Sequence, residues 1–429
     1  MSQGTPEAEG IHLLEAVLRW PPESFIDWKI RSLAARGIRV TVASDVPRRA
    51  AAATPPGVGL AHLPPWDESR IRKAAALAVD ALRLLVRDPS RLVRLVRAVR
   101  RPQAPERRPT PWPVALAQLR RFLPLARVRP DVVHFEWETA AARLLPLIDA
   151  WRCPVVLSCR GREIHVYSRT SAGADWVARL PEAFDRAAAV HCVSEAIRDD
   201  AARHGLDPAK ARIIRPAVDT GFFRPATAKS PESAVLRVIT LADLVWMKGH
   251  EYALQAVALL AGRGVPVRLD IVGHERPDLP NQAGNRDRIL STIEDLGLGA
   301  QVRMHGKLDP AAVRTRLRRS DVLLHASLTE GIPNAVLEAM ACGVPVVVTD
   351  CGGTTEAVAD GREGFVVAPR DPEAMAAALE RLWNDPDLRA RMGRAGRERV
   401  ESAFELDEQV TRIVALYQDV LAASNGARG

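Results

Sequence analysis

Residues 330–350 read EGIPNAVLEAMACGVPVVVTD and combine a loop, a helix start and an apolar strand in one short stretch. The residues before them, DVLLHAS at 321–327, are apolar enough for a strand that is buried on both faces. Pro333 is typical of a helix start, and Gly343 of a helix end. Residues 344–350 then predict the next strand. A strand, a helix and a strand at this spacing predict a parallel sheet covered by helices on both faces.

The same alternation occurs in both halves of the chain. In the first half we expect strands at 11–17, 38–44, 131–136, 154–159 and 188–194. In the second half we expect them at 235–242, 267–273, 301–306, 321–327, 344–350 and 363–369. The sequence therefore predicts an α/β protein with two Rossmann-like, doubly wound parallel-sheet domains that face a central cleft. The expected parts are a disordered tail at 1–10, an N-terminal domain at 11–217, a linker at 218–232, a C-terminal domain at 233–403, and a helix at 404–429 that returns to the N-terminal domain.

Length and composition fit this organisation. The chain has 429 residues, which is too many for one ordinary core, and its 47% hydrophobic and 26% charged content is that of a globular protein. The longest apolar runs fall well short of the ~20 residues that span a bilayer. The first ten residues do not resemble a signal peptide. The five cysteines show no CxxC spacing, so we expect buried free thiols in a reducing cytoplasm.

Positive charge is concentrated in one segment. Residues 70–130 hold 16 Arg and Lys against 3 acids, an excess of 13, although the whole chain carries only +8. Within this segment, DPSRLVRLVRAVRR predicts a helix that places Arg91, Arg94, Arg97 and Arg101 on one face. Such a helix favours contact with an anionic membrane surface, and a core-packed helix with a solvated Arg face is the alternative. Nucleic acid is disfavoured, because no aromatic residues interleave with the arginines.

The opening stretch predicts an anion site. The loop 328–332 follows a strand, so it lies at the carboxyl edge of the sheet, and the helix after it directs N–H groups from about Gly331 to Ala335 toward the cleft. A helix N-terminus is suited to a diphosphate. Glu338 lies further along the same helix, where a carboxylate can accept from two ribose hydroxyls. Glu330 is then placed near a sugar on the other side of the diphosphate.

These residues carry a family resemblance. The stretch with Glu330 and Glu338 resembles the glutamate–seven residues–glutamate signature of retaining glycosyltransferases of family 4, which have the GT-B fold. Residues 21–42, PPESFIDWKIRSLAARGIRVTV, are similar to the opening of exopolysaccharide and colanic-acid-type members. Residues 190–225 resemble the segment that leads into the linker, and WMKGHEYALQA at 246–256 resembles the segment of the donor-phosphate lysine. The resemblance spans roughly residues 11 to 405.

The resemblance implies roles for individual residues. Lys248 would hold the donor diphosphate, Glu338 the nucleotide ribose, and Glu330 would lie at the transferred sugar. The backbone at Gly331, Ile332, Pro333 and Asn334 would contact the phosphates. No metal or other cofactor is implied, because the helix dipole and cations replace it.

Three departures from the family pattern stand out. Asp243 occupies a position where the family usually has an arginine, and a carboxylate beside a diphosphate repels it. We expect Asp243 to turn away and Arg160 or Arg162 to supply donor-binding charge. Glu136 replaces a histidine often found near the sugar, so it is a second candidate catalytic residue, with a packed strand-end glutamate as the alternative. The glycine-rich loop after the first strand is replaced by RWPPESF.

The expected function is a hexosyltransferase-type glycosyltransferase (EC 2.4). It would move a sugar, with retention, from a UDP- or GDP-sugar to a lipid-linked or polysaccharide acceptor in cell-surface glycan biosynthesis. It would be cytoplasmic and peripheral at the inner face of the cell membrane, without nucleic acid as a partner. Two alternatives are a catalytically degenerate binding protein, favoured by Asp243, and a nucleotide-sugar epimerase of the same fold.

Overall fold

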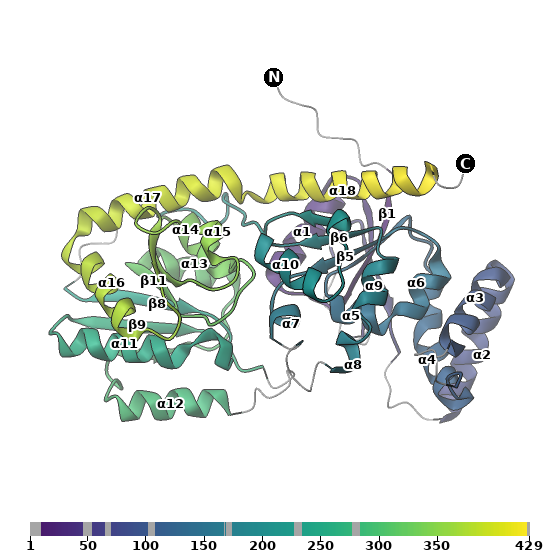
Figure 1. Ribbon diagram of the computed structural model, residues 1–429, viewed down its shortest axis with the longest axis horizontal. Coiled ribbons are helices and arrows are strands. Elements are labelled where there is room, and N and C mark those ends of the chain that lie inside the picture. The colour runs from purple at the N-terminus through teal and green to yellow at the C-terminus, as the bar shows by residue number, and fades with distance from the viewer. Residues whose placement is uncertain are drawn as a thin grey trace, which may run out of the picture. The chain divides into compact units, whose positions relative to one another are not determined.

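The chain folds into two compact units (Figure 1). The computed structural model describes residues 10–45, 54–64, 70–101, 108–166, 168, 174–226, 234–276 and 284–426. Unit 1 comprises Met1–Cys192, Arg198–Ile214 and Val410–Gly429, and unit 2 comprises Val193–Ile197 and Arg215–Gln409. Residues 1–9 of the predicted tail and 227–232 of the predicted linker lie outside the described residues, while residues 218–226 belong to unit 2.

The sheet of unit 1 has seven parallel strands in the order β3-β2-β1-β4-β5-β6-β7. They are β1 (His12–Leu18), β2 (Arg39–Ser44), β3 (Val58–His62), β4 (Val132–Phe135), β5 (Val155–Cys159), β6 (Ala189–Cys192) and β7 (Ala211–Ile213). The five strands predicted for this half are confirmed. The sequence analysis missed β3 and β7, because both are edge strands that are only partly buried and lack a continuous apolar run.

Helices connect these strands. They are α1 (Ser24–Ala35), α2 (Arg70–Arg87), α3 (Pro89–Arg100), α4 (Trp112–Ala126), α5 (Glu138–Arg143), α6 (Leu145–Trp151), α7 (Arg162–His165), α8 (Ala174–Val177), α9 (Leu180–Arg186) and α10 (Glu195–Arg203). Helix α3 begins as predicted, because the Asp88 side chain accepts from the Arg91 backbone N–H at 2.9 Å and Pro89 occupies the first turn. Helices α2, α3 and α4 pack against one another.

The arginines of α3 do not form one lipid-facing surface, which corrects the prediction made for them. Arg91 lies on the buried face of the helix and donates to two backbone carbonyls at the C-terminal end of α4, at 2.8 and 3.0 Å. Arg94 is half-buried and donates to the Ala150 carbonyl at 3.2 and 3.3 Å. Only Arg97 and Arg101 are exposed. The last carbonyls of a helix have no intrahelical partner, so they provide acceptors for a buried guanidinium.

The sheet of unit 2 has six parallel strands in the order β10-β9-β8-β11-β12-β13. They are β8 (Leu236–Leu241), β9 (Val267–Val272), β10 (Val302–Met304), β11 (Val322–His325), β12 (Val346–Thr349) and β13 (Gly364–Val367). All six were predicted from the sequence. The strand order reverses between β8 and β11, and ligands of such sheets bind beside the carboxyl ends of the strands at this point.

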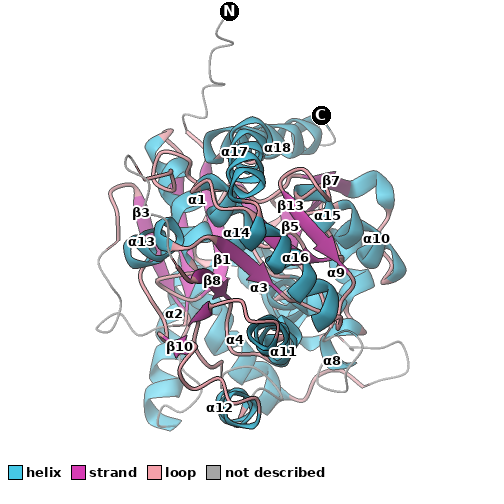
Figure 2. Cartoon of the chain, turned by 90° about the vertical axis from the view of Figure 1, so that its left-hand side faces the viewer, coloured by secondary structure: helices cyan, strands magenta, loops and turns pink. Residues whose placement is uncertain are grey.

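Helices cover both faces of the second sheet. They are α11 (His250–Gly262), α12 (Asn285–Asp295), α13 (Pro310–Arg319), α14 (Asn334–Ala341), α15 (Thr354–Ala357), α16 (Pro372–Asn384) and α17 (Pro386–Ala403). The last helix of the chain is α18 (Leu406–Gly426). Helix α11 packs against α12 and α16, whereas α14 packs against α17. Figures 1 and 2 show α11 and α12 on the same side of the strands. The prediction of two doubly wound parallel sheets is confirmed.

None of the five cysteines forms a disulfide; four are buried and Cys153 is half-buried. Within the part of the chain that the structure describes, no helix combines the length and the apolar character that crossing a bilayer requires.

A chain of hydrogen bonds crosses three neighbouring strands of unit 1 and ends on α18. Tyr417 Oη lies 2.6 Å from His134 Nδ1, and His134 Nε2 lies 2.8 Å from Ser158 Oγ. Ser158 Oγ lies 2.8 Å from His191 Nδ1, and His191 Nε2 lies 2.8 Å from the Ile214 carbonyl oxygen. Because a carbonyl only accepts, His191 Nε2 carries a proton. With both imidazoles neutral, Ser158 Oγ then donates to His191 Nδ1, and His134 Nε2 donates to Ser158 Oγ. The Tyr417 hydroxyl donates to His134 Nδ1.

Burial keeps both imidazoles of this chain neutral. Burial, together with the nearby Lys29 charge, holds the pKa of His134 well below its usual value. Burial also lowers the pKa of His191 to about 3. Each ring therefore has one donor and one acceptor nitrogen, and both nitrogens have a partner. The chain ties α18 to the sheet of unit 1 without a buried charge.

Changing Tyr417 to Phe should destabilise unit 1. The substitution removes the hydroxyl that donates to His134 Nδ1 and leaves this buried acceptor without a partner, which costs about 1–3 kcal/mol. The measurement is urea unfolding of the full chain, with Tyr252→Phe on the half-buried face of α11 as the matched control. A Tyr417→Phe protein as stable as the control would show that the hydrogen bond contributes nothing.

Candidate active site

One carboxylate oxygen receives three donors at the carboxyl edge of the second sheet. Glu330 Oε1 lies 2.9 Å from His325 Nε2 and 2.8 Å from Ser327 Oγ, and it forms an ion pair with the Lys248 ammonium. His325 ends β11 and Glu330 lies in the loop after it, while Lys248 ends a short 3-10 helix (Trp246–Lys248) after β8. Glu330 Oε2 has no hydrogen-bond partner among the described residues. That oxygen remains available to a bound molecule.

The Glu330 carboxyl stays ionised. Burial alone would raise its pKa, but the Lys248 charge and the hydrogen bond from His325 outweigh burial and hold the pKa well below its usual range. Glu330 is therefore an acceptor and a fixed negative charge, not a proton donor.

Glycines bring the loops of this edge into backbone contact. A Cβ on Gly249, after Lys248, would lie 2.1 Å from the Ala326 carbonyl oxygen. A Cβ on Gly352, in the loop after β12, would lie 1.8 Å from the Glu330 carbonyl oxygen, and one on Gly353 would lie 2.3 Å from that of Gly331. Real Cβ atoms do not approach this closely, so these positions require glycine.

The N-terminus of α14 follows this loop. The helix begins at Asn334 after Pro333 and ends at Ala341 before Gly343 (φ 73°), as the sequence predicts. No side chain caps its first turn. The Asn334 Oδ1 atom is buried and has no hydrogen-bond partner among the described residues. A first turn without a cap, beside a lysine and an unpartnered amide, is chemically suited to an anionic, polar molecule.

Glu338 has the opposite electrostatic environment to Glu330. It lies half-buried on α14, and no hydrogen bond or ion pair of its carboxylate occurs among the described residues. Burial raises the pKa of the Glu338 carboxyl to about 8. A carboxyl group with a raised pKa and no protein partner among the described residues is a candidate for a ligand contact.

Asp243 is neutralised inside unit 2. Its carboxylate lies 3.2 Å from Arg276 Nη1 and 3.0 Å from His274 Nδ1, both in the loop after β9. Its backbone carbonyl accepts from His250 Nε2 at 3.0 Å. The partners of Asp243 thus come from unit 2 itself, and the expectation that Arg160 or Arg162 supplies donor-binding charge stays a prediction. The sequence IVGHERP could have predicted the pairing of Asp243. Polar residues that follow a buried strand lie at the carboxyl edge of the sheet, where the residues after β8 also lie.

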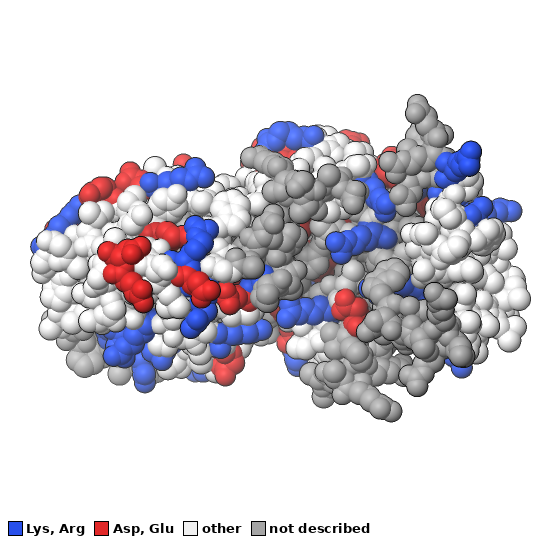
Figure 3. Space-filling model, turned by 90° about the horizontal axis from the view of Figure 1, so that it is seen from below, with Lys and Arg blue, Asp and Glu red and all other residues white. Residues whose placement is uncertain are grey.

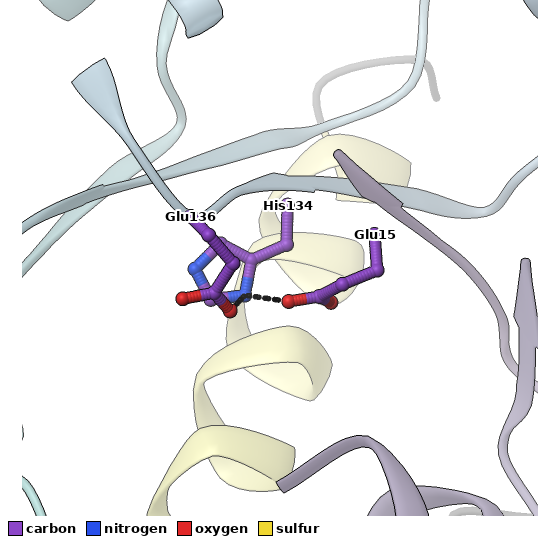
Figure 4. A group of neighbouring side chains, drawn as sticks. All are labelled: Glu15, His134 and Glu136. Carbon is purple, nitrogen blue, oxygen red and sulfur yellow. Dashed lines mark ion pairs between the residues drawn. The ribbon is translucent and has the colours of Figure 1, made fainter. Parts of the chain in front are cut away.

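A second cluster of charges is buried in unit 1. The Lys29 ammonium of α1 lies 2.5 Å from Glu15 Oε1 of β1 and also contacts the Glu136 carboxylate. The Arg160 guanidinium contacts the other oxygen of Glu136. Figure 4 shows the side chains of Glu15, His134 and Glu136 pointing toward one another in front of the helix that carries Tyr417. Two carboxylates and two cations thus balance in the interior, as buried charges require.

The contacts of Glu136 and Arg160 in this cluster differ from the roles that the sequence analysis expected for them. Glu136 has no exposed surface and is held by two cations, so the packed strand-end glutamate, the alternative reading, is what the structure shows. Arg160 is paired with it, and Arg162 begins α7. The sequence analysis missed Glu15 and Lys29. A glutamate inside an apolar strand and a lysine between Ile26 and Ile30 could have predicted buried, paired charges.

The same cluster has the spacing of a metal site. Ligand atoms of Glu15, His134 and Glu136 lie within 4.8 Å of one another, the one such group among the described residues. However, the Lys29 ammonium contacts both carboxylates and occupies the role of the cation. His134 donates and accepts within the hydrogen-bond chain to Tyr417 and Ser158. These residues do not fit a metal ion.

Two known protein families together match most of the chain. Residues 29–222 match the family described as Glycosyltransferase Family 4, and residues 226–399 match the family described as Glycosyl transferases group 1. The chain belongs to the glycosyltransferases of the family 4 type. The first matched region contains β2 to β7 of unit 1, and the second contains all six strands of unit 2 with Lys248, Glu330 and Glu338.

Curated relatives of this glycosyltransferase have several activities. It is 27% identical over 334 residues to a glycogen synthase of Mycobacterium tuberculosis, covering 74% of this chain and 77% of the relative. It is 32% identical over 233 residues to a D-inositol 3-phosphate glycosyltransferase of Acidothermus cellulolyticus, covering 51% and 50%. The finer resemblance to exopolysaccharide and colanic-acid-type members remains a prediction.

Solved structures share the fold of this glycosyltransferase. A sucrose-phosphate synthase of Thermosynechococcus elongatus superposes with a TM-score of 0.75 at 18% identity, covering 96% of this chain and 100% of the other. The Anabaena protein HepE, solved with UDP and glucose, superposes with a TM-score of 0.68 at 17% identity, covering 95% and 99%. The chain therefore has the GT-B fold.

Changing Glu338 to Gln should stabilise the protein in a pH-dependent manner. The folded pKa of about 8 exceeds the ordinary value of 4.5. Stability linked to this group is therefore present below about pH 4.5 and lost as the pH rises through 8. We expect the Tm of the variant to exceed that of wild type by an amount that widens from about pH 5 to pH 8, equivalent to ~1–3 kcal/mol. Glu398→Gln on exposed α17 is the control, and an equal Tm at every pH would contradict the assignment.

Changing Arg276 to Ala should expose the Asp243 charge and weaken the binding of UDP or GDP several-fold, because like charges repel at the carboxyl edge. If Arg276 acts by neutralising Asp243, the double variant Asp243→Asn/Arg276→Ala should bind as wild type does. Isothermal titration measures both. A double variant as weak as Arg276→Ala would show instead that Arg276 contacts the nucleotide itself.

Proposed function

We propose that this glycosyltransferase transfers a hexose, with retention of configuration, from a UDP- or GDP-sugar to a lipid-linked or polysaccharide acceptor in cell-surface glycan synthesis. It would act in the cytoplasm at the inner face of the membrane and need no metal ion or other cofactor. The observation that carries the proposal is the arrangement around Glu330. The ionised Glu330 carboxylate pairs with Lys248 and keeps one oxygen without a described partner. The start of α14, four residues later, has no side-chain cap and carries the unpartnered Asn334 amide oxygen.

The donor diphosphate would lie between Lys248 and the N-terminus of α14. The Lys248 ammonium pairs with Glu330, and a diphosphate would offer it a second anionic partner. Backbone N–H groups at Gly331, Ile332 and Asn334 would stabilise the phosphate charge, which grows as the sugar–phosphate bond breaks. The neutral Glu338 carboxyl would donate to one ribose hydroxyl and accept from another, or ionise and accept from both.

Glu330 would act on the transferred sugar without forming a bond to it. Its low pKa keeps it ionised, so it stabilises positive charge that develops on the sugar ring as the leaving group departs. Oε1 is held by His325, Ser327 and Lys248, and this fixes the direction of Oε2. In same-face attack, the departing diphosphate takes the acceptor proton.

Neither alternative gains support from the side chains. The non-catalytic reading rested on an unpaired Asp243, but His274 and Arg276 neutralise that carboxylate. The epimerase reading has no observation in its favour. One structure of this fold was solved with UDP and glucose, and one relative is named a glycogen synthase, which supports a nucleotide-sugar donor.

A donor panel tests the proposal. Thermal shift with UDP- and GDP-sugars identifies the donor, because a bound ligand stabilises the folded chain by mass action. Incubation of that donor with a glycan or polyprenyl-phosphate-linked acceptor, followed by NMR of the product, gives the anomeric configuration. Transfer with retention supports the proposal. Conversion of the free donor without acceptor, or inversion in the product, contradicts it.

Changing Lys248 to Ala should lower both donor affinity and turnover, because the leaving diphosphate is more negative in the transition state than in the ground state. One charge-assisted contact is worth about 1.5–3 kcal/mol, or roughly ten- to 150-fold in kcat/KM. Lys307→Ala, an exposed lysine of unit 2, is the matched control. If kcat/KM of Lys248→Ala stays within about twofold of the control, another group must hold the diphosphate.

A further inference from the structure

Exposed apolar side chains gather on three helices of unit 1. Of nine strongly exposed large hydrophobic residues in the described chain, eight lie on α2, α3 and α4. Four of them form a stripe along α2, which we call the α2 stripe: Val79, Leu82, Leu85 and Val86, with exposed fractions of 46, 61, 48 and 77%. Leu84, on the opposite side of the helix, is 2% exposed. Helix α2 is therefore apolar both toward the unit and away from it.

Helix α4, which packs against α2, also exposes an aromatic residue. Trp112 is 53% exposed at its first position, and Leu116, one turn later, is 43% exposed. The Arg100 guanidinium lies 4.5 Å from the centre of the Trp112 ring. Tryptophan with an adjacent cation is typical of side chains that sit at the boundary between lipid and water.

The charge around the apolar side chains is positive. Residues 70–130 hold 16 basic residues against 3 acids. Of the two acids on the described helices, Asp80 pairs with Arg127 at 2.7 Å and Asp88 caps α3. Arg83 and Arg87 are exposed beside the α2 stripe. In Figure 3 the right-hand end, where α2, α3 and α4 lie in Figure 1, is mostly uncharged with Lys and Arg side chains at its margin.

We propose that the α2 stripe, with Trp112 and Leu116, docks onto the surface of an anionic lipid bilayer. Apolar side chains would enter the acyl boundary while arginines meet the headgroup phosphates, as in helices that lie in the membrane plane. A second copy of this chain fits less well. A two-fold contact places the same surface against itself, so the positive margins of both copies would repel. An anionic bilayer offers an acyl boundary to the exposed apolar side chains and negative headgroups to the arginines.

This surface replaces the arginine face of α3, where Arg91 and Arg94 are held by backbone carbonyls. The inference rests on the proposed membrane location. It is tested without donor or acceptor, so failure of lipid binding and failure of sugar transfer are separate results.

The experiment is co-sedimentation of the full chain with vesicles of phosphatidylcholine, with or without phosphatidylglycerol. Wild type should bind the phosphatidylglycerol vesicles and lose binding as salt rises, because salt screens the headgroup attraction. The triple variant Val79→Ser/Leu82→Ser/Val86→Ser should lose at least tenfold in partitioning. The double variant Arg83→Gln/Arg87→Gln should lose several-fold on anionic vesicles only.

A matched control is Arg391→Gln/Arg394→Gln on exposed α17 of unit 2, which removes the same charge and should bind as wild type does. Circular dichroism checks that each variant is folded, and light scattering reports the oligomeric state. Wild type that binds anionic and neutral vesicles equally weakly would overturn the proposal, whatever the variants do. So would a wild-type dimer that the triple variant dissociates while vesicle binding is unchanged.

Discussion

Contact between backbones at the carboxyl edge of the second sheet is the constraint on which the candidate site depends. Lys248, Glu330 and the start of α14 come from loops after two different strands, and glycines let these loops touch. Gly249 lies against Ala326, and Gly352 lies against Glu330, at distances that exclude any Cβ. Since the loops cannot separate without losing these contacts, the lysine and the carboxylate are held together before a donor arrives. Preorganised charge of this kind costs no rearrangement when the bond breaks.

The two glutamates of the signature differ because their surroundings differ. Glu330 receives a lysine, a histidine and a serine on one oxygen and stays ionised. Glu338, eight residues later on α14, has no such donors among the described residues, and burial raises its pKa to about 8. One carboxylate thus supplies a fixed charge and the other a hydrogen-bonding group, a division that environment alone produces. It suits a site in which a charged sugar and a neutral ribose lie on opposite sides of a diphosphate.

Much of the fold and part of the site followed from the residues themselves. Strands such as VPVVVTD are buried on both faces, so their apolar runs are continuous and easy to find, whereas the edge strands β3 and β7 are not. Lys248, Glu330 and Glu338 were found because the family signature and the helix start mark them. His325, Ser327, His274 and Arg276 were missed, since single polar residues at strand ends are common. Their roles depend on which strands are neighbours, and only the sheet order gives that.

The sequence by itself determined the two parallel sheets, a helix start at Pro333 (within one residue of the observed start) and the uneven distribution of charge, because periodicity, turn residues and composition act locally. Tertiary structure alone decided which charges pair. Asp243 pairs with residues of the loop after β9, Glu136 pairs with Lys29 and Arg160, and Arg91 donates to carbonyls at the end of another helix. The physical reason is desolvation. A buried charge must find a partner wherever packing brings one, and residues far apart in the sequence meet only when the strands and helices have assembled.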